Sequence, residues 1–134
     1  MASELDAEVL AFAHQMFELA RAGTTEQLAA YLDAGLPVNL TNDKGDSLLM
    51  LAAYHAHPAT VSALLERGAD TGRVNDRGQT PLGAAVFRRS AETVRLLLDA
   101  GADPGLGAPS ALDMARFFDL PEMLAQLQEA TPRP

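Results

Sequence analysis

The clearest pattern in the chain is an apolar stripe that recurs with the spacing of one helix face. The stripe consists of Val61, Leu64 and Leu65 in one stretch, and of Val94, Leu97 and Leu98 in the next. Apolar residues at positions i, i+3 and i+4 lie on the same side of an α-helix. The pattern therefore predicts two amphipathic helices, over about residues 58–67 and 91–100.

A short alanine-rich segment precedes each of these helices. Its expected helical bounds are residues 49–55 in the first case and 82–88 in the second. Pro81 suits a first helical position, because the missing N–H has no partner there in any helix. The residues expected to cap the short helices with a side-chain oxygen are Ser47, Thr80 and Ser110. We therefore expect pairs made of a short helix and a longer one.

Glycine and leucine recur along the chain at one constant spacing. The matched sets are Gly35, Gly68 and Gly101, and Leu32, Leu65 and Leu98. The glycines follow the longer helices, where a left-handed backbone ends a helix and glycine adopts it at no steric cost. Asn-Asp-Lys-Gly at residues 42–45 and Asn-Asp-Arg-Gly at 75–78 indicate turns. A fixed period in the range of about 20–50 residues predicts a solenoid of stacked helix pairs.

The two ends of the chain depart from the repeat, as the terminal units of a solenoid must. Residues 5–42 predict a longer first helix, over about 5–21, and a second one, over about 24–34. Residues 108–130 predict a shortened last unit, and residues 131–134 a disordered tail. The outer side of the first helix is expected to be polar and to carry Glu4, Glu8, Gln15 and Glu18. Polar outer faces let an array end without exposing its core.

Composition narrows the classes of function. The chain has 134 residues, a formal net charge of -8 and no cysteine, so disulfides and thiolate chemistry are excluded. Its bases are scattered apart from Arg88 and Arg89, whereas nucleic-acid sites need clustered Lys and Arg. Neither a secretion signal nor a membrane span is recognisable. We expect a cytoplasmic protein without nucleic-acid or membrane partners, and the preference for Arg over Lys points to a bacterial source.

These motifs resemble those of the ankyrin repeats, over about residues 5–130. The family pattern of T-P-L-H and G-A-D is matched by Thr80-Pro81-Leu82, Gly68-Ala69-Asp70 and Gly101-Ala102-Asp103. The resemblance implies an all-α ankyrin-repeat solenoid, with about four stacked helix-turn-helix units and short β-hairpin-like turns. The units of this single domain would be residues 5–42, 43–75, 76–107 and 108–130. Met50 and Gly83 replace the family histidine, which predicts weaker ordering between units.

No arrangement of residues in the sequence indicates catalysis. The histidines are His14, His55 and His57, and the last two do not share a helical face, so no metal site is expected. The resemblance implies that the ring of His57 contacts backbone groups, and His55 is expected at the surface. The carboxylates are dispersed, and no glycine-rich loop precedes a lysine. We expect no enzyme activity, no cofactor and no metal.

The resemblance also implies where a partner would bind. Ankyrin proteins usually contact partners through the hairpin tips and the solvent side of the first helices, which form one concave surface. The residues at the tips are Asp43, Lys44, Asp46, Asp76, Arg77 and Gln79. The ends of the first helices add Tyr54, His55, Phe87 and Arg88. The predicted function is therefore non-catalytic binding of a protein partner through these residues.

Three aromatic residues are expected in one column along this surface, beginning beside Arg21. Tyr54 and Phe87 are one repeat period apart, and Phe117 follows if three residues of the last turn are deleted. Aromatic residues and arginine are enriched in binding hot spots. The alternative is that these rings pack against the helices. We expect such packing for Phe117 or Phe118, and both alternatives stay open for Tyr54 and Phe87.

Two other functions are not excluded by the sequence. A small ligand-binding protein or an enzyme would need convergent polar groups in a deep pocket of the concave groove, whereas a solenoid offers a shallow one. A self-assembling protein would need an apolar end face, and the polar ends predicted above argue against it. We therefore expect a monomer that binds an unidentified protein.

Overall fold

The computed structural model describes residues 4–130, with side chains from residue 7 onward. Within this range the chain forms eight helices and no strand. The helices are α1 (Glu4–Ala22), α2 (Thr25–Asp33), α3 (Leu48–Tyr54), α4 (Pro58–Glu66), α5 (Pro81–Phe87), α6 (Ala91–Asp99), α7 (Ala111–Phe117) and α8 (Pro121–Ala130). The prediction of an all-α solenoid is confirmed, and the helix bounds predicted from the sequence lie within one residue of these. The tail expected at residues 131–134 lies outside the described residues.

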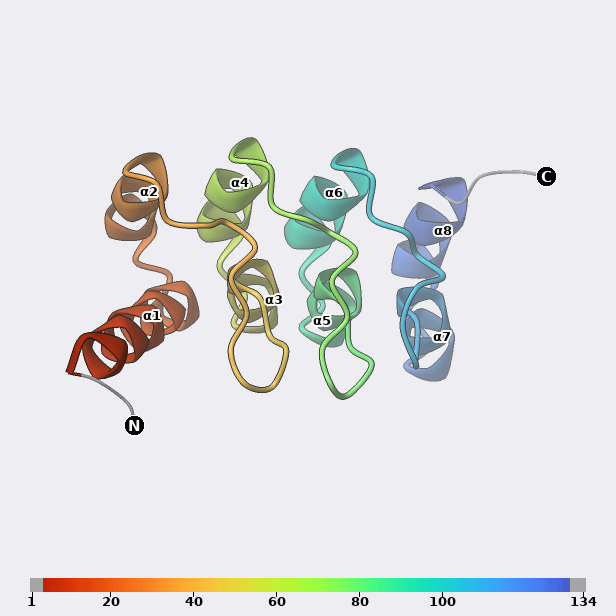
Figure 1. Cartoon of the computed structure of the whole chain (residues 1–134). Coiled ribbons are helices and arrows are strands. Elements are labelled where there is room, and N and C mark those ends of the chain that lie inside the picture. Colours follow the sequence, from red (N-terminus) through yellow and green to blue (C-terminus); the bar gives the residue numbers. More distant parts are fainter. Residues whose placement is uncertain (1–3, 131–134) are drawn as a thin grey trace.

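The helices stack as four pairs in two layers (Figure 1). One layer contains α1, α3, α5 and α7, and the other contains α2, α4, α6 and α8. Each helix packs against the equivalent helix of the next pair, as α3 does against α5 and α4 against α6. The turns that precede α3 and α5 extend from the same edge of the array. Equivalent residues of successive pairs therefore lie next to one another.

The core is continuous from α1 to α8, because each pair presents small or aliphatic residues to its neighbours. Ala52, Ala53, Ala84 and Ala85 are buried between the first helices and let their backbones approach closely. The predicted stripe of the second helices is buried at its centre, where Val61, Leu64, Val94 and Leu97 have no exposed surface. Full burial of one such side chain stabilises the fold by about 2 kcal/mol.

The predicted helix ends are confirmed. The hydroxyls of the capping residues accept hydrogen bonds from the backbone N–H three residues on, in Ser47, Thr80 and Ser110. Pro81 occupies the first turn of α5. Gly68 and Gly101 follow α4 and α6 with φ angles of +84° and +92°, in the left-handed region that glycine adopts most easily.

The two long turns are held in the same way by an asparagine. The side-chain oxygen of Asn42 accepts hydrogen bonds from the N–H groups of Lys44 and Asp46, at 2.9 Å each. Asn75 makes the equivalent bonds to Arg77 and Gln79, at 3.0 and 2.9 Å. Such bonds replace the backbone partners that a turn lacks. These side-chain bonds add to the backbone hydrogen bonds that close each tip, from Asn42 to Asp46 and from Asn75 to Gln79, at 3.0 Å each.

The outer side of α1 is less polar than the sequence suggested. Glu8, Gln15 and Glu18 are exposed as predicted, and the side chain of Glu4 is not described. Three large apolar side chains are nevertheless exposed on the same helix, namely Val9, Leu10 and Phe12. The reason is the length of α1, which has 19 residues against 7 in α3. Among the side chains of α1 that the structure describes, from residue 7 onward, the buried apolar ones begin at Met16, so the preceding turns extend past the neighbouring helix.

Candidate functional site

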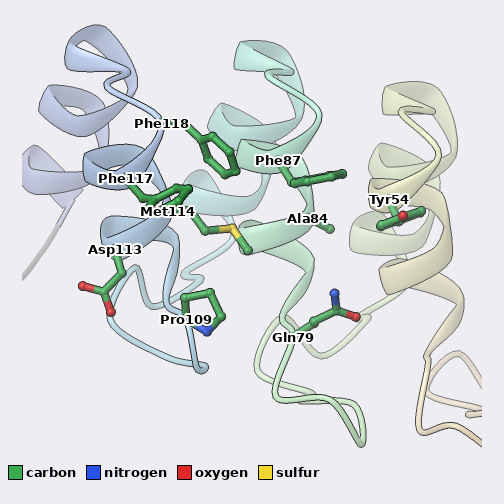
Figure 2. Close-up of a pocket in the computed structure, with 9 residues that line it drawn as sticks. All are labelled: Tyr54, Gln79, Ala84, Phe87, Pro109, Asp113, Met114, Phe117 and Phe118. Carbon is green, nitrogen blue, oxygen red and sulfur yellow. The ribbon is translucent and has the colours of Figure 1, made fainter.

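Tyr54, Phe87 and Phe118 form a continuous line of rings across three helix pairs, which we call the aromatic row (Figure 2). Tyr54 ends α3, Phe87 ends α5, and Phe118 follows α7. The rings of Tyr54 and Phe87 are stacked, with centroids 6.1 Å apart. The rings of Phe87 and Phe118 meet edge to face, with centroids 6.2 Å apart. Both arrangements are favourable for aromatic pairs.

The sequence placed Phe117 in this row, and that prediction is wrong. The side chain of Phe117 is 82% exposed, and the packing expected for Phe117 or Phe118 in the last unit is made by Phe118. Phe118 is half-buried instead, and Phe117 contacts only the edge of its ring. Phe118 turns back toward α5, where its ring contacts the ring of Phe87 and the guanidinium of Arg89. Phe117 gains neither and stays in solvent.

Arg89 was not selected from the sequence as a residue of this site, and neither were Pro109, Asp113 and Met114 of the hollow beside it. Its guanidinium carbon lies 4.9 Å from the centre of the Phe118 ring, within the range of a cation–π contact. The same guanidinium donates a hydrogen bond from Nη1 to the backbone oxygen of Phe87, at 2.9 Å. Arg89 therefore links the last two rings of the row. The sequence shows that Arg88 and Arg89 are adjacent, but it does not show that the side chain of Arg89 lies over the ring of Phe118.

An apolar hollow of about 470 Å³ lies beside the aromatic row. Its lining residues are Tyr54, Gln79, Ala84, Phe87, Pro109, Asp113, Met114, Phe117 and Phe118. The side chain of Met114 reaches from α7 toward α5 (Figure 2). A Cβ at Gly83 would make only an ordinary contact with the sulfur of Met114, at 3.7 Å, and would lie closer to Oγ1 of Thr80, at 3.2 Å. The aromatic rings and Met114 give the hollow a mainly apolar surface.

A second, polar hollow of about 370 Å³ lies next to the first. Its lining residues are Arg21, Lys44, Asp46, Met50, Leu51, Tyr54, His55, Asn75, Asp76, Arg77 and Gln79. Tyr54 and Gln79 line both hollows, so the two are adjacent. The polar hollow lies toward the hairpin tips, and the apolar hollow lies toward the last helix pair. We refer to both together as the groove.

The tips that border the groove are also held to one another. The amide nitrogen of Asn75 donates hydrogen bonds to carboxylate Oδ1 of Asp46 and to Oε1 of Gln79, at 2.8 Å each. The backbone N–H of Asp76 donates to the backbone oxygen of Lys44, at 3.0 Å. One side of the groove is therefore a connected polar network that spans two helix pairs.

The comparison with known families decides what kind of protein carries this groove. The family described as ankyrin repeats, in three copies, matches residues 16–107. The chain belongs to the ankyrin-repeat family. Ankyrin repeats generally act as protein–protein interaction modules and are generally not enzymes.

One similar protein comes from Pseudomonas aeruginosa, and its name places it among the ankyrin repeat proteins. It is 59% identical to this chain over 58 residues. These residues make up 43% of this chain and 34% of the relative, so the match covers about a third of that longer protein.

The ankyrin-repeat chain brings eight of its ten predicted partner-binding residues into the groove. These are Lys44, Asp46, Tyr54, His55, Asp76, Arg77, Gln79 and Phe87. Asp43 and Arg88 are exposed but line neither hollow. Across the described residues, no three His, Asp or Glu side chains are grouped as metal ligands. Over the same residues, no helix is long and apolar enough to cross a membrane.

His55 is half-buried and lines the polar hollow at the surface of the ankyrin array. Its ring packs edge to face against Tyr54, with centroids 5.2 Å apart. Burial lowers the pKa of His55 below its ordinary value of 6.5. The positive charges of His57, Arg21 and Arg88 lower it further, and Glu18 opposes them. Arg21 and Arg88 are the permanent positive charges that act on this ring.

His57 makes a backbone contact of the kind that the ankyrin resemblance implied. Its Nε2 donates a hydrogen bond to the backbone oxygen of Arg21, at 2.7 Å. The ring also lies close to Gly23, where a Cβ would lie 2.6 Å from Nδ1. The contact joins the first helix pair to the second. It thereby holds the backbone of Arg21, whose side chain lines the polar hollow.

Proposed function

We propose that this chain is a non-catalytic interaction module, which binds a protein partner through the aromatic row and the hairpin tips beside it. The observation that carries the proposal is that the rings touch one another and yet stay accessible. Tyr54 is 37% exposed and Phe87 is 42% exposed. Aromatic side chains are among the commonest hot spots of protein interfaces. A row of them beside an apolar hollow is the kind of surface that a partner covers.

The groove is also rigid enough to bind without a large loss of entropy. Each ring of the row is held by its neighbour, and the tips are held by Asn42 and Asn75. Ordering one flexible side chain at an interface costs about 0.5–1.5 kcal/mol. Side chains that are fixed before binding avoid part of this cost. The arrangement therefore supports binding by a surface that is already formed.

A second candidate function is the binding of a small apolar ligand in the same groove. The apolar hollow, at about 470 Å³, has the size of many ligand pockets. Its wall at Phe117 is largely exposed to solvent, and Gln79 and Asp113 are its polar side chains besides Tyr54. A ligand site normally covers most of its ligand and directs several polar groups to it. A protein partner therefore suits the hollow better.

Quantitative affinity capture tests the proposed function. The chain, its Phe87→Ala variant and its Leu10→Ala variant are immobilised, and proteins retained from the source organism are compared by mass spectrometry. Leu10 is the control, because it is 70% exposed and lies on α1 outside the groove. We expect a specific protein that the wild type and Leu10→Ala retain and Phe87→Ala loses. Equal retention by all three would contradict the proposal.

The oligomeric state and the location of the protein belong to the same proposal. We propose that the chain acts as a cytoplasmic monomer, and that the groove rather than the apolar side of α1 is its binding surface. The exposed Val9, Leu10 and Phe12 on α1 weaken the sequence argument against self-assembly. That alternative therefore has a test of its own, described in the Discussion.

A further inference from the structure

Positive charge gathers along one edge of the groove, where the first helices end. The permanently charged basic residues on this edge are Arg21, Arg88 and Arg89. The acidic residues are Glu18, which pairs with Arg21, and Asp119. Asp119 holds the place of Arg89 in the last pair, since both have positive φ angles, of 53° and 56°. Arginine thus outnumbers acid on this edge of a chain whose formal net charge is -8.

Arg88 is the cation of this edge that is left without a partner. It is exposed at the end of α5 and forms no ion pair with the side chains that the structure describes. By contrast, Arg21, Arg67 and Arg116 each pair with a carboxylate. The charge of Arg88 also reaches His55, whose pKa it helps to lower. A carboxylate of a partner placed near Arg88 would therefore meet a guanidinium that pairs with no carboxylate among the described side chains.

The opposite edge of the groove, at the hairpin tips, carries no excess of positive charge. Within the described part of the chain Lys44 and Arg77 lack ion pairs as well, but each follows an aspartate directly, Asp43 and Asp76. Asp46 lies at the same tips, so three aspartates face two cations and the formal charge there is -1. The groove is electrically polarised toward the ends of α3 and α5.

These observations define the kind of partner that the groove fits, if the proposed function holds. We infer that the partner presents an acidic side chain next to a large apolar one. The apolar side chain enters the hollow against Phe87 and Met114, and the carboxylate lies over Arg88. Complementary charge of this kind adds specificity and speeds association.

The overall charge of the chain makes this preference selective. An acidic segment is repelled by most of a surface with net charge -8 and attracted at the Arg88 edge. A basic segment would be attracted almost everywhere and would gain no preferred place. Discrimination often relies on such repulsion from the wrong sites as much as on attraction to the right one.

Selection from a displayed library of short random peptides tests the inference without a known partner. We expect the wild type to enrich peptides in which Asp or Glu stands within four positions of Phe, Leu, Ile, Tyr or Trp. Binding of a synthetic peptide from this set should weaken roughly thirtyfold or more in Phe87→Ala, as for a hot spot. It should also weaken with rising salt, because exposed charges are screened.

Charge reversal isolates the acidic part of the inference. We expect Arg88→Glu to weaken the selected peptide roughly three- to tenfold and Arg88→Gln less, as for an exposed ion pair. Arg95→Glu is the matched control, because Arg95 is exposed on α6 and lines neither hollow. Arg88→Glu should also select peptides with Lys or Arg in place of the acid. Arg88 is exposed, so its variants are expected to keep the fold.

The outcomes separate this inference from the proposed function. Peptides that depend on Phe87 but carry no acid, or that bind Arg88→Glu as well as the wild type, overturn the inference and leave the proposed function standing. Enrichment of peptides that bind Phe87→Ala unchanged, or no enrichment at all, overturns both. Acidic peptides that lose affinity in Arg88→Glu and keep it in Arg95→Glu support both.

Discussion

The rings of Tyr54 and Phe87 stack with their planes 9° apart, although a whole repeat separates them in the sequence. Because the two positions are one repeat period apart, both residues end the first helix of their pair. The contact between α3 and α5 then places one ring against the other. The repeat thus produces the stacking of Tyr54 on Phe87 directly, whereas Phe118 joins the row through its contacts with Phe87 and Arg89.

Replacement of Phe87 by alanine should destabilise the fold only modestly. The ring is 42% exposed, so its removal leaves no closed cavity, and we expect a loss of about 1 kcal/mol. Leu82→Ala, in the buried face of the same helix, should cost about 2–5 kcal/mol. Urea unfolding followed by circular dichroism measures both. If Phe87→Ala costs as much as Leu82→Ala, Phe87 is a core residue and the proposed interface loses its centre.

Substitution of Gly23 should weaken the junction between the first two helix pairs. A Cβ there would lie 2.6 Å from the ring of His57, and the φ angle of +72° adds strain. Gly68→Ala is the matched control, since its φ is +84° and no atom lies within 4 Å of the added Cβ. Both should lose about 1 kcal/mol from backbone strain. Gly23→Ala should lose clearly more, and equal losses in thermal melts would show that the His57 contact contributes nothing.

Asp33 and Arg67 join the second helices of two successive pairs. Arg67 Nε lies 2.8 Å from Asp33 Oδ1, and Nη2 lies 3.2 Å from Oδ2. These hydrogen bonds, with the charge of Arg67, lower the pKa of Asp33 below its ordinary value of 3.8. The stabilisation is therefore present above that value and is lost as pH falls through the lower pKa of the folded state.

A titration of the Asp33 carboxyl carbon by NMR checks this pair. We expect a pKa below 3.8 in the wild type and a return toward 3.8 in Arg67→Met. Arg95→Met should leave the Asp33 titration unchanged, because Arg95 takes part in none of the ion pairs that the structure describes. An Asp33 pKa that does not respond to Arg67→Met would mean that the pair is absent in solution.

The titration of His55 should report the positive edge of the groove. Its pKa should lie below 6.5, because burial and the charges of His57, Arg21 and Arg88 disfavour its protonated form. Because the pKa of His55 is lower in the folded state than its ordinary value, the free energy of unfolding is highest above pH 6.5. It falls as pH drops through the lower pKa of the folded state. In NMR titrations, Arg88→Gln should raise the pKa of His55 and Arg95→Gln should not. A wild-type pKa at or above 6.5 would contradict this description.

Leu10 provides the test for self-assembly. We predict that Leu10→Lys leaves the sedimentation coefficient unchanged and shifts stability by no more than about 0.5 kcal/mol, as for most surface substitutions. The reason is that Leu10 is 70% exposed in the single chain. A wild-type dimer that Leu10→Lys converts to a monomer would instead identify the apolar side of α1 as an interface between copies.

The sequence was sufficient for the parts of the structure that depend on equivalence between repeats. Helix bounds, the caps at Ser47 and Thr80, and the left-handed glycines all follow from local rules that act in every unit. The stacking of Tyr54 on Phe87 follows from the period together with close packing of the first helices.

The ends of the array were harder to predict, because their side chains have a neighbour on one side only. The period identified Phe117 as equivalent to Phe87, but it carried no information on which of two adjacent rings would turn toward α5. The contacts with Phe87 and Arg89 favour Phe118. For the same reason, the polar residues of α1 did not reveal that Leu10 is exposed beside them.

The most direct test of the central claim is to map where a protein segment binds. Amide and aromatic NMR signals of the chain are followed during titration with a partner segment isolated by capture or peptide selection. The account predicts shifts that centre on Tyr54, Phe87 and Phe118, extend to the tip residues Lys44 and Arg77, and disappear in Phe87→Ala. Shifts that centre on the apolar side of α1 or on the outer helices α4 and α6, with the aromatic row unchanged, would contradict it.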